Sequence, residues 1–150
     1  MSDRDTFVKY VPTMAVEYCF DLWKTLNFTL KVKKSRLTKL GDYRYLPKEG
    51  KHIISVNSDL NLYSFLITYL HEVAHLQVQL AYGSRPKPHG KEWKNAFQKI
   101  TLPVLNSAVF PDDILRHLAA YIKNPKASSC NDHTLYMALS QYDQEQKVFL

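Results

Sequence analysis

The segment from Leu60 to Ser84 constrains the fold more than any other part of this 150-residue chain, because it contains a single formally charged residue, Glu72. Its large apolar residues recur at steps of three and four, the spacing of one face of an α-helix. Residues 57–59 offer N-cap side chains, and Gly83 offers a C-terminal stop. The pattern predicts a helix of about five turns, with a core-facing stripe formed by Leu62, Leu66, Tyr69, Val73, Leu76 and Leu80.

Two histidines lie off this stripe, in the sequence His71-Glu72-Val73-Ala74-His75. Residues four apart project from the same side of a helix, so both imidazoles can reach one ion. Neutral imidazole nitrogen suits Zn²⁺, and a catalytic zinc site has three protein ligands and a fourth position open to water. A carboxylate on an otherwise uncharged helix is costly unless a partner or a task retains it. We therefore predict that His71 and His75 bind zinc and that Glu72 is the general base.

The third ligand is predicted to be His89, in the loop after the helix. Pro86 and Pro88 end the helix and stiffen this loop, so that the chain can turn back toward the metal, and Gly90 permits a close approach of the backbone. The remaining histidines lack such a context and are expected to be ordinary surface or core residues: His52, His117 and His133.

The remaining segments predict an α+β domain, since helical and strand-like patterns occur without the alternating series that builds a parallel sheet. Residues 47–50 are rich in turn formers and separate two strand-like runs, which predicts a hairpin. Helices are expected over residues 12–26, 90–101 and 134–142 and after residue 113, and strands over residues 28–32, 42–46 and 52–56.

The length predicts one domain over residues 1–150, with its core over residues 12–125 and a C-terminal extension over residues 126–150. The apolar end, Val148-Phe149-Leu150, resembles the start of a strand, so we expect the natural chain to continue beyond it. No secretory signal and no apolar stretch long enough to cross a bilayer is visible, which favours a cytoplasmic protein without a membrane partner. Cys19 and Cys130 are expected to be reduced and without a functional role.

The net charge of +6 is concentrated in two segments. Residues 31–51 contain eight basic and two acidic side chains, and residues 85–99 contain five basic and one acidic side chain. Such clusters attract polyanions, although basic runs more often form solvated surface. Nucleic acid is therefore a candidate partner through these two segments.

The motif His71-Glu72-Val73-Ala74-His75 and the later His89-Gly90-Lys91-Glu92-Trp93 together resemble the paired motifs of the SprT-like, or Spartan-like, family of zincin metallopeptidases. Residues 40–44 and 53–57 are similar to the hairpin that leads into that family's active-site helix, so the resemblance covers residues 28–100. It implies a zincin-like domain with a small antiparallel sheet packed on helices. It also implies zinc binding by the three histidines and catalysis by Glu72.

The same resemblance implies a class of substrate. In zincins the strand before the active-site helix commonly pairs with an extended peptide, which would place residues 53–56 against the substrate. Eukaryotic members of the family digest proteins crosslinked to DNA, so DNA-associated proteins are candidate substrates. The present sequence lacks the DNA-binding zinc ribbon and the short partner-binding motifs of those members.

Other functions use a metal-binding motif of this kind. A nucleic-acid-binding or scaffold module would hold a non-catalytic zinc ion, but a structural site normally has four protein ligands and no use for Glu72. A deformylase has its metal-binding cysteine in a strand before the helix, whereas Cys19 lies in a predicted helix. The donor that stabilises the transition-state oxyanion is left open among Tyr43, Tyr45, Tyr82 and Arg85.

Overall fold

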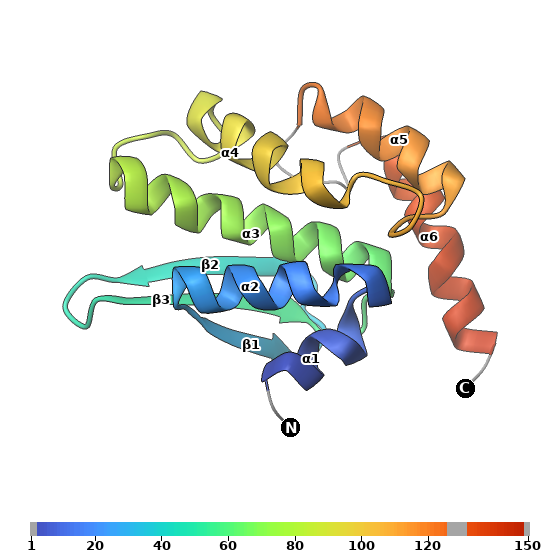
Figure 1. The fold of residues 1–150 in the computed structure, drawn as a ribbon, viewed down its shortest axis with the longest axis horizontal. Helices are drawn as coiled ribbons and strands as arrows, with labels where there is room; N and C mark the ends of the chain where they lie inside the picture. Colours follow the sequence, from blue (N-terminus) through green and yellow to red (C-terminus); the bar gives the residue numbers. More distant parts are fainter. Residues whose placement is uncertain (1–2, 126–131, 149–150) are drawn as a thin grey trace.

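The computed structural model describes residues 3–125 and 132–148 and combines helices with one small sheet, so the fold is α+β as predicted. Helix α3 lies between the sheet and helix α4, and α6 lies near the end at which α3 begins (Figure 1). The elements in chain order are α1 (Asp3–Tyr10), η1 (Thr13–Ala15), α2 (Val16–Leu26), β1 (Thr29–Lys33), β2 (Gly41–Leu46), β3 (Lys51–Asn57), α3 (Leu62–Tyr82), α4 (Lys91–Thr101), η2 (Leu102–Val104), α5 (Asp112–Ile122) and α6 (His133–Val148).

The sheet has three strands in the order β1-β3-β2. β2 and β3 form the predicted antiparallel hairpin, with Tyr45 opposite His52. β1 pairs with the other edge of β3 and runs parallel to it, with Thr29 opposite Ile53. The expectation of an antiparallel sheet is therefore wrong for β1. The reason lies in the connection, because residues 34–40 carry the chain past the position that β3 later occupies.

Helix α3 is the predicted long helix and contributes to the centre of the core. The stripe is fully buried at four of its six predicted positions: Leu66, Tyr69, Val73 and Leu76. Leu62 is only partly buried. The expectation was wrong for Leu80, which is 56% exposed, because the last residues of α3 lie at the surface.

The two ends of α3 are capped by different means. Oδ1 of Asn61 accepts hydrogen bonds from the backbone N–H groups of Tyr63 at 3.1 Å and Ser64 at 2.9 Å. The cap was expected within residues 57–59, which is wrong because β3 continues to Asn57 and a turn follows it. Gly83 ends the helix as predicted, with a positive φ of 73° and its N–H bonded to the carbonyl of Gln79.

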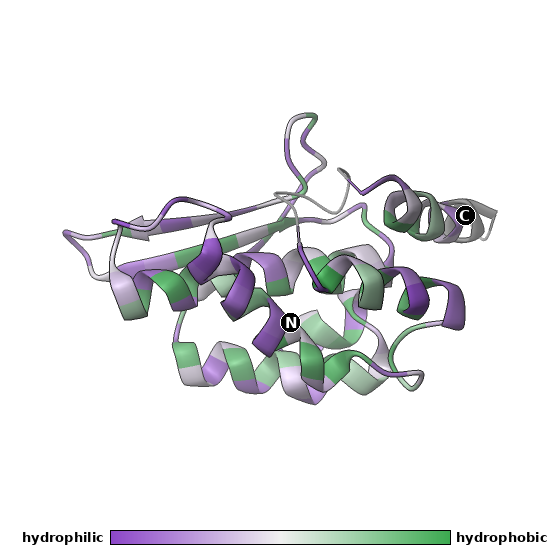
Figure 2. Ribbon diagram, turned by 90° about the horizontal axis from the view of Figure 1, so that it is seen from above, coloured by the Kyte–Doolittle hydropathy of each residue, from purple (hydrophilic) through white to green (hydrophobic). Residues whose placement is uncertain are grey.

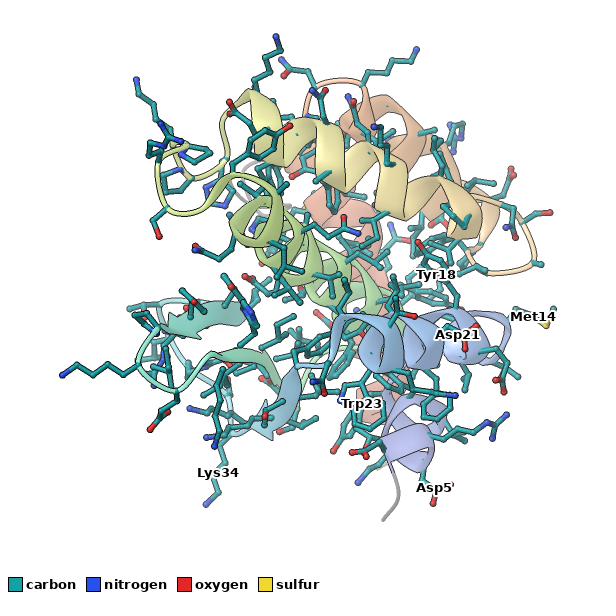
Figure 3. All side chains as sticks on the ribbon, turned by 60° about the vertical axis from the view of Figure 1, so that its left-hand side comes forward. Asp5, Met14, Tyr18, Asp21, Trp23 and Lys34 are labelled. Atoms are coloured by element: carbon teal, nitrogen blue, oxygen red, sulfur yellow. The ribbon has the colours of Figure 1, made fainter. Side chains whose placement is uncertain are left out.

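The N-terminal helices pack against α3, and hydrogen bonds from two tyrosine hydroxyls join α2 to α3 and α4. The predicted helix over residues 12–26 is divided into η1 and α2, and α1 was not predicted. Tyr18 points from α2 toward α4, where its hydroxyl donates to the carbonyl of Ile100 (Figure 3). The hydroxyl of Tyr69 donates to the carbonyl of Cys19, a free and fully buried cysteine. Cys130 lies outside the described residues.

The C-terminal helices α5 and α6 pack on each other, and α6 contacts the start of α3. α5 begins at Asp112, two residues before the start that was expected after residue 113. α6 is longer than predicted and includes Val148, so the expectation of a strand is wrong for that residue. The helix extends to this residue because good helix formers precede it: Gln144, Glu145, Gln146 and Lys147. Phe149 and Leu150 lie outside the described residues.

The two faces of the sheet differ in character. Ile54 and Val56 face the helices and are fully buried. The opposite face exposes Lys31, Lys33 and Arg44. In Figure 2 the helices that pack on the sheet lie to one side of it, and the tip of the β2–β3 hairpin is hydrophilic. Among the described residues, no helix has both the length and the apolarity needed to cross a membrane.

Candidate metal centre

Three histidine side chains meet between α3 and the loop that follows it. Nε2 of His89 lies 3.0 Å from Nε2 of His71 and 3.0 Å from Nε2 of His75. The ligand atoms of the three residues all lie within 4.8 Å of one another. Within residues 3–125 and 132–148, no other group of three potential ligands is found. The fold thus brings together the three predicted ligands as a group that can hold a metal ion.

The three histidines come from two different local structures, a helix and a turn. His71 and His75 lie one helical turn apart in the middle of α3. His89 adopts a left-handed φ of 61°, which is uncommon for a residue other than glycine. The N–H of Gly90 donates to the carbonyl of Lys87 at 3.0 Å and closes a turn around His89. This turn directs the third imidazole back toward α3.

Burial keeps the imidazoles neutral. Desolvation, with smaller contributions from the neighbouring His75 and His89, lowers the pKa of His71 to about 3. Desolvation, with a contribution from His89, lowers the pKa of His75 to about 4. Burial also lowers the pKa of His89. A neutral imidazole has a free lone pair on one ring nitrogen, and this neutral form of histidine binds metal ions.

Trp93 packs against all three histidines. Its indole lies in near-parallel stacking on His75, with ring centroids 5.6 Å apart, and contacts His71 at 4.7 Å and His89 at 4.8 Å. Its Nε1–H donates to the backbone carbonyl of His71 at 3.1 Å. Trp93 is 1% exposed, so this ring closes the cluster on the side of α4.

Glu72 is 7% exposed and follows the first histidine of the pair. Desolvation and, to a smaller extent, the negative charge of Asp42 raise the pKa of its carboxyl from 4.5 to about 8. The positive charges of Arg36 and Lys39 act in the opposite direction. A carboxyl group with a pKa near neutrality can both accept and release a proton at physiological pH.

The three clustered histidines and Glu72 line one open cleft of about 550 Å³. Its walls come from β2 and the residues before it, from α3, from the loop after α3, and from α4 and α5. Gly41, Asp42 and Tyr43 of β2 line the cleft. Residues 53–56 do not, and they lie on the central strand with both edges already paired. The expectation that residues 53–56 pair with a substrate is therefore wrong, because β3 has no free edge.

The four candidate oxyanion donors differ in position. Tyr43 lines the cleft, but its hydroxyl lies 2.7 Å from Nδ1 of His52. Tyr45, Tyr82 and Arg85 are exposed and do not line the cleft. His52 lies between the two β2 tyrosines, stacked on Tyr45 with ring centroids 4.8 Å apart. His117 is half-buried and His133 is exposed. Like His52, both lie outside the group of three histidines that can hold a metal ion.

Two cleft residues were missed as functional candidates. Trp93 entered the sequence prediction only as part of a motif, although its spacing of four from His89 was a usable signal. Tyr121 lines the cleft from α5 and packs edge-on against Phe97, with ring centroids 6.2 Å apart. No local pattern links Tyr121 to residues that lie so far back in the sequence.

Comparisons with known proteins agree with this geometry. The family model of the SprT-like family matches residues 13–110, which include β1 to β3, α3, the three histidines and α4. No curated protein matches the chain, and no solved structure matches it. The matched residues make up most of the sequence and contain all three clustered histidines, so the chain belongs to the SprT-like family.

Proposed function

We propose that this protein is a zinc-dependent peptidase. The observation that carries the proposal is the convergence of three neutral imidazoles beside a buried carboxyl group, Glu72, in one open cleft. Membership of the SprT-like family supports a metallopeptidase-like activity. A purely structural metal site has four protein ligands and needs neither an open cleft nor a proton acceptor.

The donor set fits zinc. Ligand nitrogens at tetrahedral angles, with Zn–N bonds of about 2.0–2.1 Å, lie about 3.3 Å from one another. The two Nε2–Nε2 distances from His89 are 3.0 Å, slightly below this spacing. Three imidazole ligands leave one position for a substrate or water. When bound, zinc would polarise the peptide carbonyl and acidify a water molecule.

The protein's own groups have distinct tasks in this proposal. Glu72 accepts a proton from the attacking water and releases it to the departing amine, which suits a carboxyl group whose pKa is raised to about 8. Trp93 fixes the orientation of the histidines through its ring contacts and its hydrogen bond to His71. The turn closed by the hydrogen bond from Gly90 to Lys87 holds His89 in its left-handed conformation.

We further propose that the substrate pairs with β2. This strand pairs with β3 along one edge only, and no other described strand pairs with its second edge. It also lines the cleft at Gly41, Asp42 and Tyr43. An extended peptide can therefore add to the sheet as a further strand and pass the three histidines. Its backbone hydrogen bonds to β2 would supply an affinity that does not depend on the peptide's sequence.

The decisive experiment combines metal content with turnover. The purified protein should contain about one zinc ion per chain, and His89→Ala should lose it. Glu72→Gln should retain zinc and stop cleavage of an unfolded protein substrate. His117→Ala, which changes a histidine outside the cluster, is the matched control. Substantial cleavage by Glu72→Gln would contradict the proposed mechanism. Zinc binding without any cleavage by the unaltered protein would favour a scaffold module with a non-catalytic ion.

A second candidate function, contact with nucleic acid, is favoured by one observation. Lys31, Lys33 and Arg44 are exposed on the face of the sheet away from the helices, and Lys34 extends outward from the end of β1 (Figure 3). Phosphate contacts through these cations would bring DNA-associated proteins to the cleft. Binding of a DNA duplex should fall steeply as salt rises and weaken in Lys31→Glu/Arg44→Glu. Lys123→Glu is the control, and binding that is absent or independent of salt would exclude this function.

A further inference from the structure

Gly41 is the first residue of β2 and lies in direct contact with the catalytic helix. A Cβ atom built on Gly41 would lie 2.6 Å from Cγ2 of Thr68, 3.0 Å from the carbonyl oxygen of Ser55 and 3.1 Å from Oε2 of Glu72. Two of these three atoms belong to α3, and one of the two belongs to the carboxylate of Glu72. The edge strand therefore reaches the catalytic carboxylate at the one position without a side chain.

The need for glycine at this position arises from space and not from backbone conformation. Gly50 and Gly83 have positive φ values, whereas Gly41 does not. A built Cβ at Gly50 or Gly83 would contact nothing within 4 Å. Gly41 thus differs from both, because it is the close approach of β2 to α3 that excludes a side chain there.

The start of β2 cannot slide away to relieve such a contact, because Asn57 holds it. The backbone N–H of Asn57 donates to the carbonyl of Leu40 at 2.9 Å, and its Nδ2 donates to the carbonyl of Lys39 at 2.8 Å. Arg36 in turn donates to Oδ1 of Asn57 at 2.7 Å. Asn57 is 1% exposed, so these bonds are protected from water.

We propose that Gly41 is a positioning residue that sets the distance between the edge strand and the Glu72 carboxylate. The proposal rests on the proposed peptidase function for its catalytic consequence, but the spatial relationship holds without it. Of the three crowded groups, the Ser55 carbonyl belongs to the paired backbone and is held in place. Cγ2 of Thr68 lies closest to the added side chain and must shift, and the flexible end of Glu72, at 3.1 Å, must give way as well.

The Gly41→Ala variant tests this relationship. We expect zinc content to stay at that of the unaltered protein and KM for a peptide to change little. A misplacement of about 1 Å can cost ~100-fold in rate, so kcat should fall by about 10- to 100-fold. A crystal structure of the variant should have the Glu72 carboxylate displaced from its position beside β2. Gly50→Asn is the matched control on the same hairpin, because Asn tolerates a positive φ and its side chain meets open space.

A second variant keeps the test decisive if Gly41→Ala folds poorly. Gly41→Ala/Thr68→Ser removes Cγ2, the atom that would lie closest to the added methyl group. It should recover part of the kcat lost in Gly41→Ala and return the carboxylate toward its original position. An unmoved carboxylate together with an unchanged kcat in Gly41→Ala would overturn the proposal. If the unaltered protein cleaves no peptide, the peptidase function fails, and the carboxylate position in the variant structures still decides the role of Gly41.

Discussion

The side-chain amide of Asn61 donates a hydrogen bond of 2.6 Å to a carboxylate oxygen of Asp143, although 82 residues separate the two in the sequence. The same amide donates to the carbonyl of Leu139 at 3.0 Å. Because Oδ1 of Asn61 also caps α3, one buried side chain joins the N-terminus of α3 to α6. α6 lies beyond the residues that match the family model, so the helix that carries His71 and His75 is fixed by an element outside that match.

Replacing Asn61 with alanine should destabilise the protein by about 2–3 kcal/mol, because the substitution removes a helix cap and leaves buried polar groups of α6 without a partner. Chemical unfolding followed by circular dichroism measures this change. Asn124→Ala provides the control, since Asn124 is exposed and accepts one surface hydrogen bond from Lys94. An equal effect of the two substitutions would show that the link to α6 contributes nothing particular.

The stability of the metal-free protein should fall between pH 6.5 and pH 8. The fold raises the pKa of Glu72 from 4.5 to about 8, so its contribution is fully present below pH 4.5 and is lost as pH rises through 8. The fold lowers the pKa values of His71 and His75 from 6.5, so their contributions change only below pH 6.5. Glu72→Gln should therefore gain stability relative to the unaltered protein, by about 2 kcal/mol over this interval.

Urea unfolding at several pH values in the presence of a chelator provides the measurement for this pH dependence. Glu92→Gln, a substitution of a half-buried glutamate in the first turn of α4, is the control. Parallel stability curves for Glu72→Gln and the unaltered protein would contradict the prediction.

Substituting Trp93 with phenylalanine should weaken zinc binding by about 10- to 100-fold, the usual effect of removing a group that orients metal ligands. Phenylalanine keeps an aromatic ring but cannot donate to the carbonyl of His71. Competition with a chromophoric chelator gives the affinity. Trp23→Phe alters the other tryptophan, which lies on α2 and outside the cleft, and should leave zinc affinity unchanged. Equal affinities for the two variants would argue against an orienting role.

Methylating backbone nitrogens of a peptide substrate, one at a time, should reduce its cleavage in an alternating pattern. A peptide that pairs with the free edge of β2 uses every second backbone N–H for the ladder, and a methyl group removes that donor. Cleavage rates for the series, with the unmethylated peptide as reference, measure the effect. A uniform loss, or none, would show that the substrate is not held as an added strand.

The sequence by itself determined the parts of this protein that depend on local spacing. The turn-rich residues 47–50 gave a correct hairpin, and Gly83 a correct helix end. The spacing of four between His71 and His75 places both rings on one side of α3, whatever the helix packs against. His89 could be predicted because a short, proline-containing loop limits how far it can lie from that helix.

Only the tertiary structure decided how the strands are ordered around the site. The alternation of residues in a strand specifies its two faces but not its neighbours, since pairing depends on contacts between distant segments. β3 therefore lies in the centre, β1 runs parallel to it, and β2 becomes the edge strand beside the three clustered histidines. The approach of Gly41 to Glu72 and the bond from Asn61 to Asp143 arise for the same reason: each joins residues far apart in the sequence, and no local pattern records such a contact.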